Sequence, residues 1–286
     1  MSSSETSSAA QPAPIEASDR WFWATLAIVS VAYLAMLAAL LIADVAYLAT
    51  EDSATSQAGP APNPLLAALG DANIRASIRL TLVSCTLTSL LSLVVAVPIG
   101  YLLSRRRFAG KALVDTLFDI PIVLPPLVVG LSLLILFQLL PSSLREAVVY
   151  QTPAVVLAQF VVASAFAIRT MRTTFDEIDP RHEQVALTLG ATRFQAFGWV
   201  VLPEARQGML AATLLAWARS LGEFGPLLVF AGATRGKTEV LSTTVFLELS
   251  VGNLKGAVAV SLLMIVAAVA VLTIARMVGG RRAANP

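Results

Sequence analysis

The sequence predicts an all-α integral membrane protein with about six transmembrane helices. Of its 286 residues, 57% are hydrophobic and only 13% are charged, which is more apolar than a soluble core of this length needs. Long apolar stretches recur, and a spanning helix needs roughly 20 apolar residues to cross a hydrocarbon layer about 30 Å thick. Polar or turn-forming segments separate these stretches, as expected of helices that satisfy their own backbone groups in lipid.

Six apolar stretches are long enough to be spans. The first begins too late and is too long for a cleavable signal peptide, so we expect it to be retained. Residues 1–20, rich in Ser, Ala and Pro, are expected to form a disordered tail, residues 21–278 a transmembrane domain and residues 279–286 a second tail. The predicted spans are 21–49, 78–103, 117–140, 153–173, 208–231 and 256–277.

The distribution of basic residues predicts the orientation of these spans. With a cytoplasmic N-terminus, the inner segments hold 12 Arg and Lys residues and the outer segments hold 5. This bias agrees with the positive-inside rule. We therefore expect a multi-pass protein of the cell (inner or plasma) membrane with both termini in the cytoplasm.

One inner segment, residues 174–207, is much longer than a connector and has a helical pattern of its own. Pro180 suits the first turn of a short helix, and Gly190 suits its left-handed exit. Thr192 and Gln195 have the spacing of a capping box that begins a second helix. Two short helices joined by a tight turn are expected to form a compact cytoplasmic knob, stiff enough to transmit force from a partner.

This segment resembles the cytoplasmic EAA loop of ABC importer permeases. The stretch EQVALTLGATRFQAFGWVVLP, residues 183–203, has the acidic residue, small residues, Gly, hydrophobic residue and Leu-Pro at the family spacing. It departs from the family where Gln184-Val185-Ala186 stands for Glu-Ala-Ala, although Glu183 supplies the acid. An ordinary amphipathic helix at the membrane surface is the alternative. The resemblance implies docking to a cytoplasmic ABC ATPase dimer through a coupling loop that includes Glu183, Ala186, Gly190, Ala191, Thr192, Phe194, Leu202 and Pro203.

Two further stretches resemble the third and fifth spans of permeases for tetrahedral oxyanions, the molybdate, tungstate and sulfate group. They are IPIVLPPLVVGL at 120–131 and WARSLGEFGPLLVFAG at 217–232. The resemblance implies a homodimer of permease chains in the lipid bilayer, supplied by an external substrate-binding protein. It also implies that the partner ATPase uses ATP and Mg²⁺, while this chain binds no cofactor itself.

The third predicted span contains helix-breaking residues. Pro125 and Pro126 each remove a backbone donor, and Gly130 follows within about a turn. Backbone groups freed in a membrane need partners or water, which favours a position that lines a translocation pathway. A kink that only improves packing is the alternative.

The fifth predicted span carries two charges. Arg219 and Glu223 lie four residues apart on one helical face, just before Gly225. Because lone charges in a span cost about 2.5 to 3.5 kcal/mol each on insertion scales, we expect the two to pair or to face a wet cavity. They would then belong to a gate, to the interface between permease copies, or to a purely structural ion pair.

The sequence offers no support for catalysis, metal binding or nucleic-acid binding. GATRGKT, residues 232–238, resembles a phosphate-binding loop but has three residues between its glycines where the pattern requires four. His182 is the only histidine and lacks clustered metal ligands or an evident orienting acid. The arginine clusters lie at membrane boundaries. We therefore expect a transporter subunit that is not an enzyme, with no catalytic residue and no metal site.

Two other functions stay open at this point. A secondary transporter would couple through intramembrane carboxylates and often has repeated halves, and neither feature is evident. A membrane-embedded enzyme or receptor would need a catalytic or ligand-binding constellation that the sequence does not display. Within the ABC permeases, another small solute is also open, because selectivity largely resides in the external binding protein.

Overall fold

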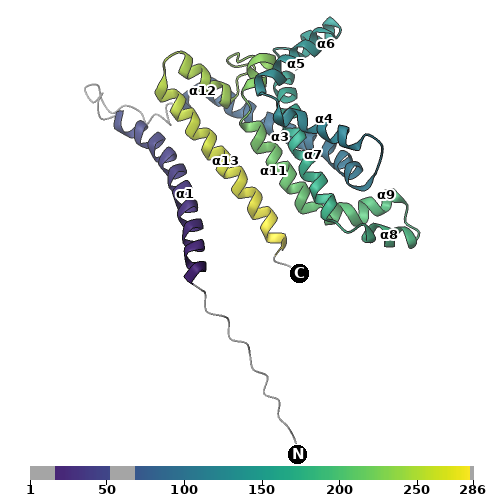
Figure 1. Ribbon diagram of the computed structural model, residues 1–286. Helices are drawn as coiled ribbons and strands as arrows, with labels where there is room; N and C mark the ends of the chain where they lie inside the picture. The colour runs from purple at the N-terminus through teal and green to yellow at the C-terminus, as the bar shows by residue number, and fades with distance from the viewer. Residues whose placement is uncertain (1–16, 52–67, 284–286) are drawn as a thin grey trace, which may run out of the picture. The chain divides into compact units, whose positions relative to one another are not determined.

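The computed structural model describes residues 17–51 and 68–283, with side chains described over residues 21–48 and 68–273. Every regular element in these ranges is a helix, which confirms the predicted all-helical fold (Figure 1). Two units make up the chain. The first contributes helix α1, Ala17–Glu51, and the second, residues 58–286, contains the other helices named below.

The predicted tails fall mostly outside the described residues, which leave out 1–16 and 284–286. Helix α1 already begins at Ala17, and the last helix, α13, runs from Leu254 to Ala283. Helical structure therefore extends a few residues beyond both limits predicted for the transmembrane domain.

Four helices in the described part of the chain are long and apolar enough to cross a membrane. They are α1, α3 (Ala72–Arg105), α7 (Thr152–Glu177) and α13. Each contains most of one predicted span, so the first, second, fourth and sixth predicted spans correspond to unbroken helices.

The third and fifth predicted spans are broken. The third is the helix pair α4 (Lys111–Val123) and α5 (Pro126–Gln138), which meet at a bend of 110°, the geometry of a broken span or of a re-entrant loop. The described residues therefore hold four spans, or five if this pair is one span. The fifth is divided between α11 (Arg206–Leu221) and the π-helix η2 (Leu227–Ala231). The observed count is thus roughly consistent with the predicted six.

Helices α3, α7 and α11 pack together as the centre of the second unit. Small residues line the contact, since a Cβ added at Gly100 of α3 would lie 2.9 Å from the backbone nitrogen of Arg172 of α7. Small residues allow membrane helices to approach closely. Gln159 of α7 joins the three helices, because it accepts a hydrogen bond from Thr88 of α3 and donates one to the carbonyl of Ser220 of α11.

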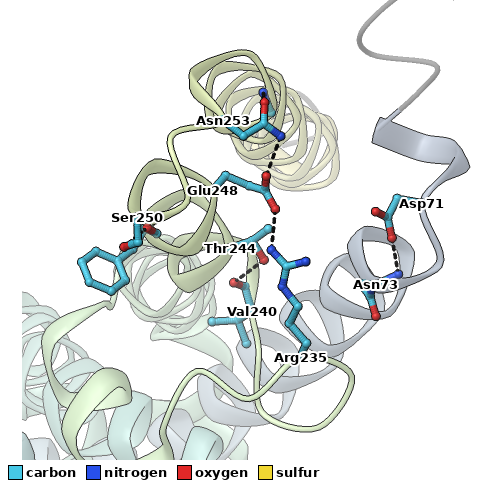
Figure 2. Close-up of polar contacts among 10 residues, drawn as sticks. Asp71, Asn73, Arg235, Val240, Thr244, Glu248, Ser250 and Asn253 are labelled. Atoms are coloured by element: carbon cyan, nitrogen blue, oxygen red, sulfur yellow. Dashed lines mark hydrogen bonds and ion pairs between the residues drawn. The ribbon is translucent and has the colours of Figure 1, made fainter.

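Between η2 and α13 lies a segment that we call the α12 loop, residues 232–253. It contains helix α12 (Leu241–Ser250), which was not predicted. A second short helix that was not predicted, α6 (Ser142–Val148), lies in the connection between α5 and α7. Glu248 joins the beginning and end of the α12 loop: it accepts hydrogen bonds from Arg235 at 2.9 Å and from Asn253 at 2.7 Å (Figure 2).

Glu239 is a buried carboxyl group within the α12 loop. Its side chain is only 3% exposed, and its Oε2 atom has no hydrogen-bond partner in the described part of the chain. Burial is the main reason that the pKa of Glu239 is raised above its ordinary value, with the Thr244 hydroxyl and Arg235 opposing the shift. The folded protein therefore keeps a proton on this group at a pH where the unfolded chain has lost it.

We predict that Glu239→Gln stabilises the protein at neutral pH. In the wild type, stability is lost as pH rises from the unfolded pKa through the raised folded pKa, because the unfolded state binds fewer protons there. The amide cannot ionise, so the melting temperatures of variant and wild type should agree near pH 4 and diverge by pH 8, with the variant higher. Thermal unfolding across this range checks the prediction, and a wild type that is the more stable form at pH 8 would contradict it.

Candidate functional site

Most of the long segment 174–207 forms a compact element that we call the knob, residues 179–204. It consists of α8 (Pro180–Thr188), α9 (Arg193–Ala196), the π-helix η1 (Phe197–Val201) and α10 (Leu202–Glu204). Figure 1 shows it at the end of α7. The predicted pair of helices is thus confirmed, with a π-helical stretch continuing the second one.

Local sequence signals account for the turn inside the knob. Pro180 occupies the first turn of α8, and Gly190 adopts a φ of 93°, a left-handed conformation that favours glycine. Thr192 accepts a hydrogen bond from the backbone nitrogen of Gln195, whose side chain accepts one from the backbone nitrogen of Thr192 at 2.8 Å. This is the predicted capping box. His182 of α8 also lies 3.0 Å from Glu204 of α10, which joins the two ends of the knob.

Glu183 points into the molecule rather than out of the knob. It is 8% exposed, accepts a 2.7 Å hydrogen bond from the hydroxyl of Tyr101, and lies 3.9 Å from the Nε of Arg105. Arg105 in turn donates to the carbonyl of Ile178, just before the knob. The acidic residue of the motif therefore attaches the knob to the end of α3.

Aromatic packing strengthens the same attachment. The ring of Phe197 in η1 lies 4.6 Å from that of Tyr101, and the ring of Phe175 in α7 lies 5.5 Å from Tyr101 on an edge. Such pairs contribute about 0.5–1.5 kcal/mol each beyond the area that they bury. We call these contacts, with Glu183 and Arg105, the joint. It links α3, α7 and the knob, so the three are expected to move together.

The other predicted coupling residues divide by exposure. Gly190, Thr192, Phe194 and Pro203 are exposed, whereas Ala186, Ala191 and Leu202 are partly buried. Phe194 stands out because 85% of it is exposed. Three other large apolar residues of the knob are also exposed and were not predicted to belong to the coupling loop. The signal that could have identified them is an apolar residue among polar neighbours on a short helix. They are Val185, Leu189 and Trp199.

The two broken spans meet at their breaks, residues 124–130 and 222–226, which we call the double break. A Cβ added at Gly130 would lie 2.7 Å from the Cα of Pro226, and one added at Gly225 would lie 2.9 Å from the backbone nitrogen of Leu127. Pro125 and Pro126 form the start of α5 at the 110° bend. The structure thus brings together Pro126, Gly130 and Gly225, which were predicted separately on two spans.

Arg219 and Glu223 pair, with 2.8 Å between the Nη2 of Arg219 and the Oε1 of Glu223. The Glu223 side chain is 1% exposed and that of Arg219 is 32% exposed. The guanidinium also lies over the ring of Phe166 of α7, 5.5 Å from its centroid. The predicted pairing is therefore present and connects α11 to Glu223 in the double break, and its role as gate, interface or structural contact stays a prediction.

A second set of charges connects α4 to α7, which sequence reasoning did not pair. Arg172 lies 2.8 Å from Asp115, and Arg169 lies 3.8 Å from Asp119. A cavity of about 270 Å³ opens beside these side chains. In the described ranges no group of three or more His, Cys, Asp or Glu side chains is arranged to hold a metal ion.

The sequence is similar to those of known transport proteins. Residues 96–283 match the family described as "Binding-protein-dependent transport system inner membrane component". Over 203 residues, 69% of this chain and 73% of the relative, the sequence is 34% identical to the sulfate transport system permease protein CysT of Salmonella typhimurium LT2. Over 167 residues, 58% of this chain and 64% of the relative, it is 35% identical to the molybdate/tungstate transport system permease protein WtpB of Pyrococcus abyssi.

The fold also resembles that of a solved transporter. A crystal structure of a bacterial ABC transporter involved in the import of the acidic polysaccharide alginate aligns with a TM-score of 0.71, over 92% of this chain and 96% of that chain. The sequences are 18% identical, so this likeness concerns the fold alone. The region matched by the family includes the knob and the double break.

Proposed function

This chain belongs to the family of binding-protein-dependent transport system inner membrane components, and on that premise we propose that it forms the translocation pathway for a tetrahedral oxyanion. It is a multi-pass permease subunit of an ABC importer, related to permeases named for sulfate and for molybdate or tungstate transport. The similarity to these relatives carries the proposal. Selection among molybdate, tungstate and sulfate is assigned to the external binding protein that delivers the substrate.

The double break is the proposed gate. Interrupted helices at membrane depth leave backbone groups that must face protein or a water-filled path, and transporters commonly bind or pass solutes at such points. Pro125, Pro126, Gly130 and Gly225 lie there, as does Glu223, which pairs with Arg219 of α11. A second copy of the chain supplies the other half of the pathway in this proposal.

The knob is the proposed coupling element. A cytoplasmic ABC ATPase dimer binds its exposed surface, hydrolyses ATP with Mg²⁺, and thereby moves the knob. The joint passes that movement to α3 and α7, because Glu183, Tyr101 and Phe197 hold the knob to both helices. Support for a cytoplasmic knob and cytoplasmic termini comes from the bias of 12 inner to 5 outer basic residues.

Phe194→Ser is predicted to weaken the ATPase complex. Phe194 makes little contact within the chain, so its loss should leave the permease folded while removing a large apolar anchor, the kind of residue that dominates binding energy at interfaces. We expect affinity for the ATPase to fall about tenfold in a pull-down or light-scattering titration. Val251→Ser, at a residue 68% exposed in the α12 loop, is the matched control. Equal losses in both variants would contradict this assignment.

Transport itself is tested in proteoliposomes that contain the permease, its ATPase and its binding protein. Uptake of radiolabelled molybdate, tungstate or sulfate should stop when ATP is depleted while a proton gradient is maintained. Persistent uptake under these conditions would favour a secondary transporter and reject the proposal. If the reconstituted complex hydrolyses ATP but takes up none of the three anions, the oxyanion assignment fails and the permease assignment stands.

A further inference from the structure

A basic pocket lies at the end of α3, beside the knob. Its cavity volume is about 600 Å³, and its lining includes Arg105 and Arg106 of α3 and Arg193 of α9. Glu183 is the one acidic side chain in the lining and is already engaged by Tyr101 and Arg105. Two positive charges are therefore left unbalanced in the pocket.

The guanidinium groups of this pocket have hydrogen-bond donors that no side chain in the described ranges accepts. No ion pair within the described ranges joins Arg106 or Arg193 to an acidic side chain, and the Nε of Arg105 is buried without a hydrogen-bond partner there. The Arg105 side chain is only 13% exposed, so this nitrogen is largely withdrawn from water. Guanidinium groups arranged in this way favour a phosphate or another oxyanion, which accepts several charge-assisted hydrogen bonds at once.

The rest of the pocket wall is apolar and continues along a membrane helix. Pro98 and Leu102 of α3 line the pocket, and two residues further back at the same four-residue spacing are also exposed. The resulting ridge on one face of α3 consists of Leu90, Val94, Pro98 and Leu102. An apolar ridge that ends in arginines matches a molecule with a hydrocarbon chain and an anionic head.

We propose that this pocket binds the phosphate headgroup of an anionic phospholipid, with an acyl chain lying along the α3 ridge. Basic pockets on the cytoplasmic side of membrane helices bind anionic headgroups, and each basic residue near the surface contributes to that attraction. Because Phe194 and Phe197 of the knob also line the pocket, the bound lipid contacts the element that we propose as the coupling device. Binding of the lipid does not depend on the identity of the transported anion.

Native mass spectrometry of the full-length permease in detergent tests this proposal. The chain is titrated with phosphatidylglycerol and with phosphatidylcholine of the same acyl chains. We expect tighter binding of phosphatidylglycerol, weakened about fivefold by R106Q or by R193Q alone and by more in the double variant. R107Q, which removes a neighbouring charge outside the pocket lining, should change this affinity less than twofold.

Three outcomes would overturn the assignment. One is equal affinity for the two lipids, and another is phosphatidylglycerol binding that the double variant leaves unchanged. The third is binding of inorganic phosphate or sulfate that R106Q and R193Q abolish while lipid binding is unaffected, which would make the pocket a site for a free oxyanion. Thermal unfolding in phosphatidylcholine should match between variants and wild type, so that a loss of lipid binding is separated from misfolding.

Discussion

Gly225→Ala and Gly130→Ala are expected to lower the melting temperature by about 5 °C and to abolish transport. In each case the new Cβ would lie within 3.0 Å of backbone atoms on the opposite side of the double break, where no side-chain rotation relieves the overlap. Overpacking of this kind costs about 1–3 kcal/mol, which outweighs the gain of about 1 kcal/mol that alanine brings to a helix. For a chain of this size, that cost corresponds to a few degrees.

Gly222→Ala is the matched control for these two variants. Gly222 lies in the same break, but a Cβ added there would approach nothing closer than 3.9 Å, the distance to the carbonyl of Arg219. It adopts ordinary right-handed backbone angles, with φ of −84°. Thermal unfolding and uptake should therefore stay near wild type. If Gly225→Ala transports normally, or if Gly222→Ala fails as completely, close packing of the double break is not what the transporter requires.

Local signals allowed much of the knob and of the helix breaks to be predicted from the sequence. The exit at Gly190 and the capping box of Thr192 and Gln195 depend on residues at most a few positions apart. The break at Pro125 and the pairing of Arg219 with Glu223 are equally local. In each case the backbone or side-chain chemistry of a few neighbours suffices to determine the conformation.

Contacts between distant segments were not predictable in the same way. Nothing local places the hydroxyl of Tyr101 on Glu183, 82 residues away, or Asp115 on Arg172. The resemblance implied that Glu183 forms or shapes the docking surface, and its burial in the joint could not be predicted from the motif. Helix α12 escaped prediction because the turn-rich segment before it, residues 232–239, resembles a simple loop and its own residues lead into an apolar span.

A double variant, Glu183→Lys with Gly190→Val, is expected to uncouple the transporter while leaving the protein in the membrane. The new lysine places a positive charge beside Arg105 and removes the acceptor of Tyr101, and breaking a buried pair in this way costs about 3–5 kcal/mol. Valine at a φ of 93° adds backbone strain of about 1–3 kcal/mol. Because neither residue lies in a span, the helices should still insert, but the knob should no longer hold its position against α3.

The measurement is the ATPase activity of the reconstituted transporter with and without the loaded binding protein. Stimulation should disappear in the double variant, and Glu183→Gln alone should lose less, since the amide oxygen still accepts from Tyr101. The matched control is Glu177→Gln with Gly198→Ala, because Glu177 is exposed at the end of α7 and a Cβ added at Gly198 meets nothing within 4 Å. Stimulation that survives in the double variant would mean that force reaches the spans by a route other than the joint.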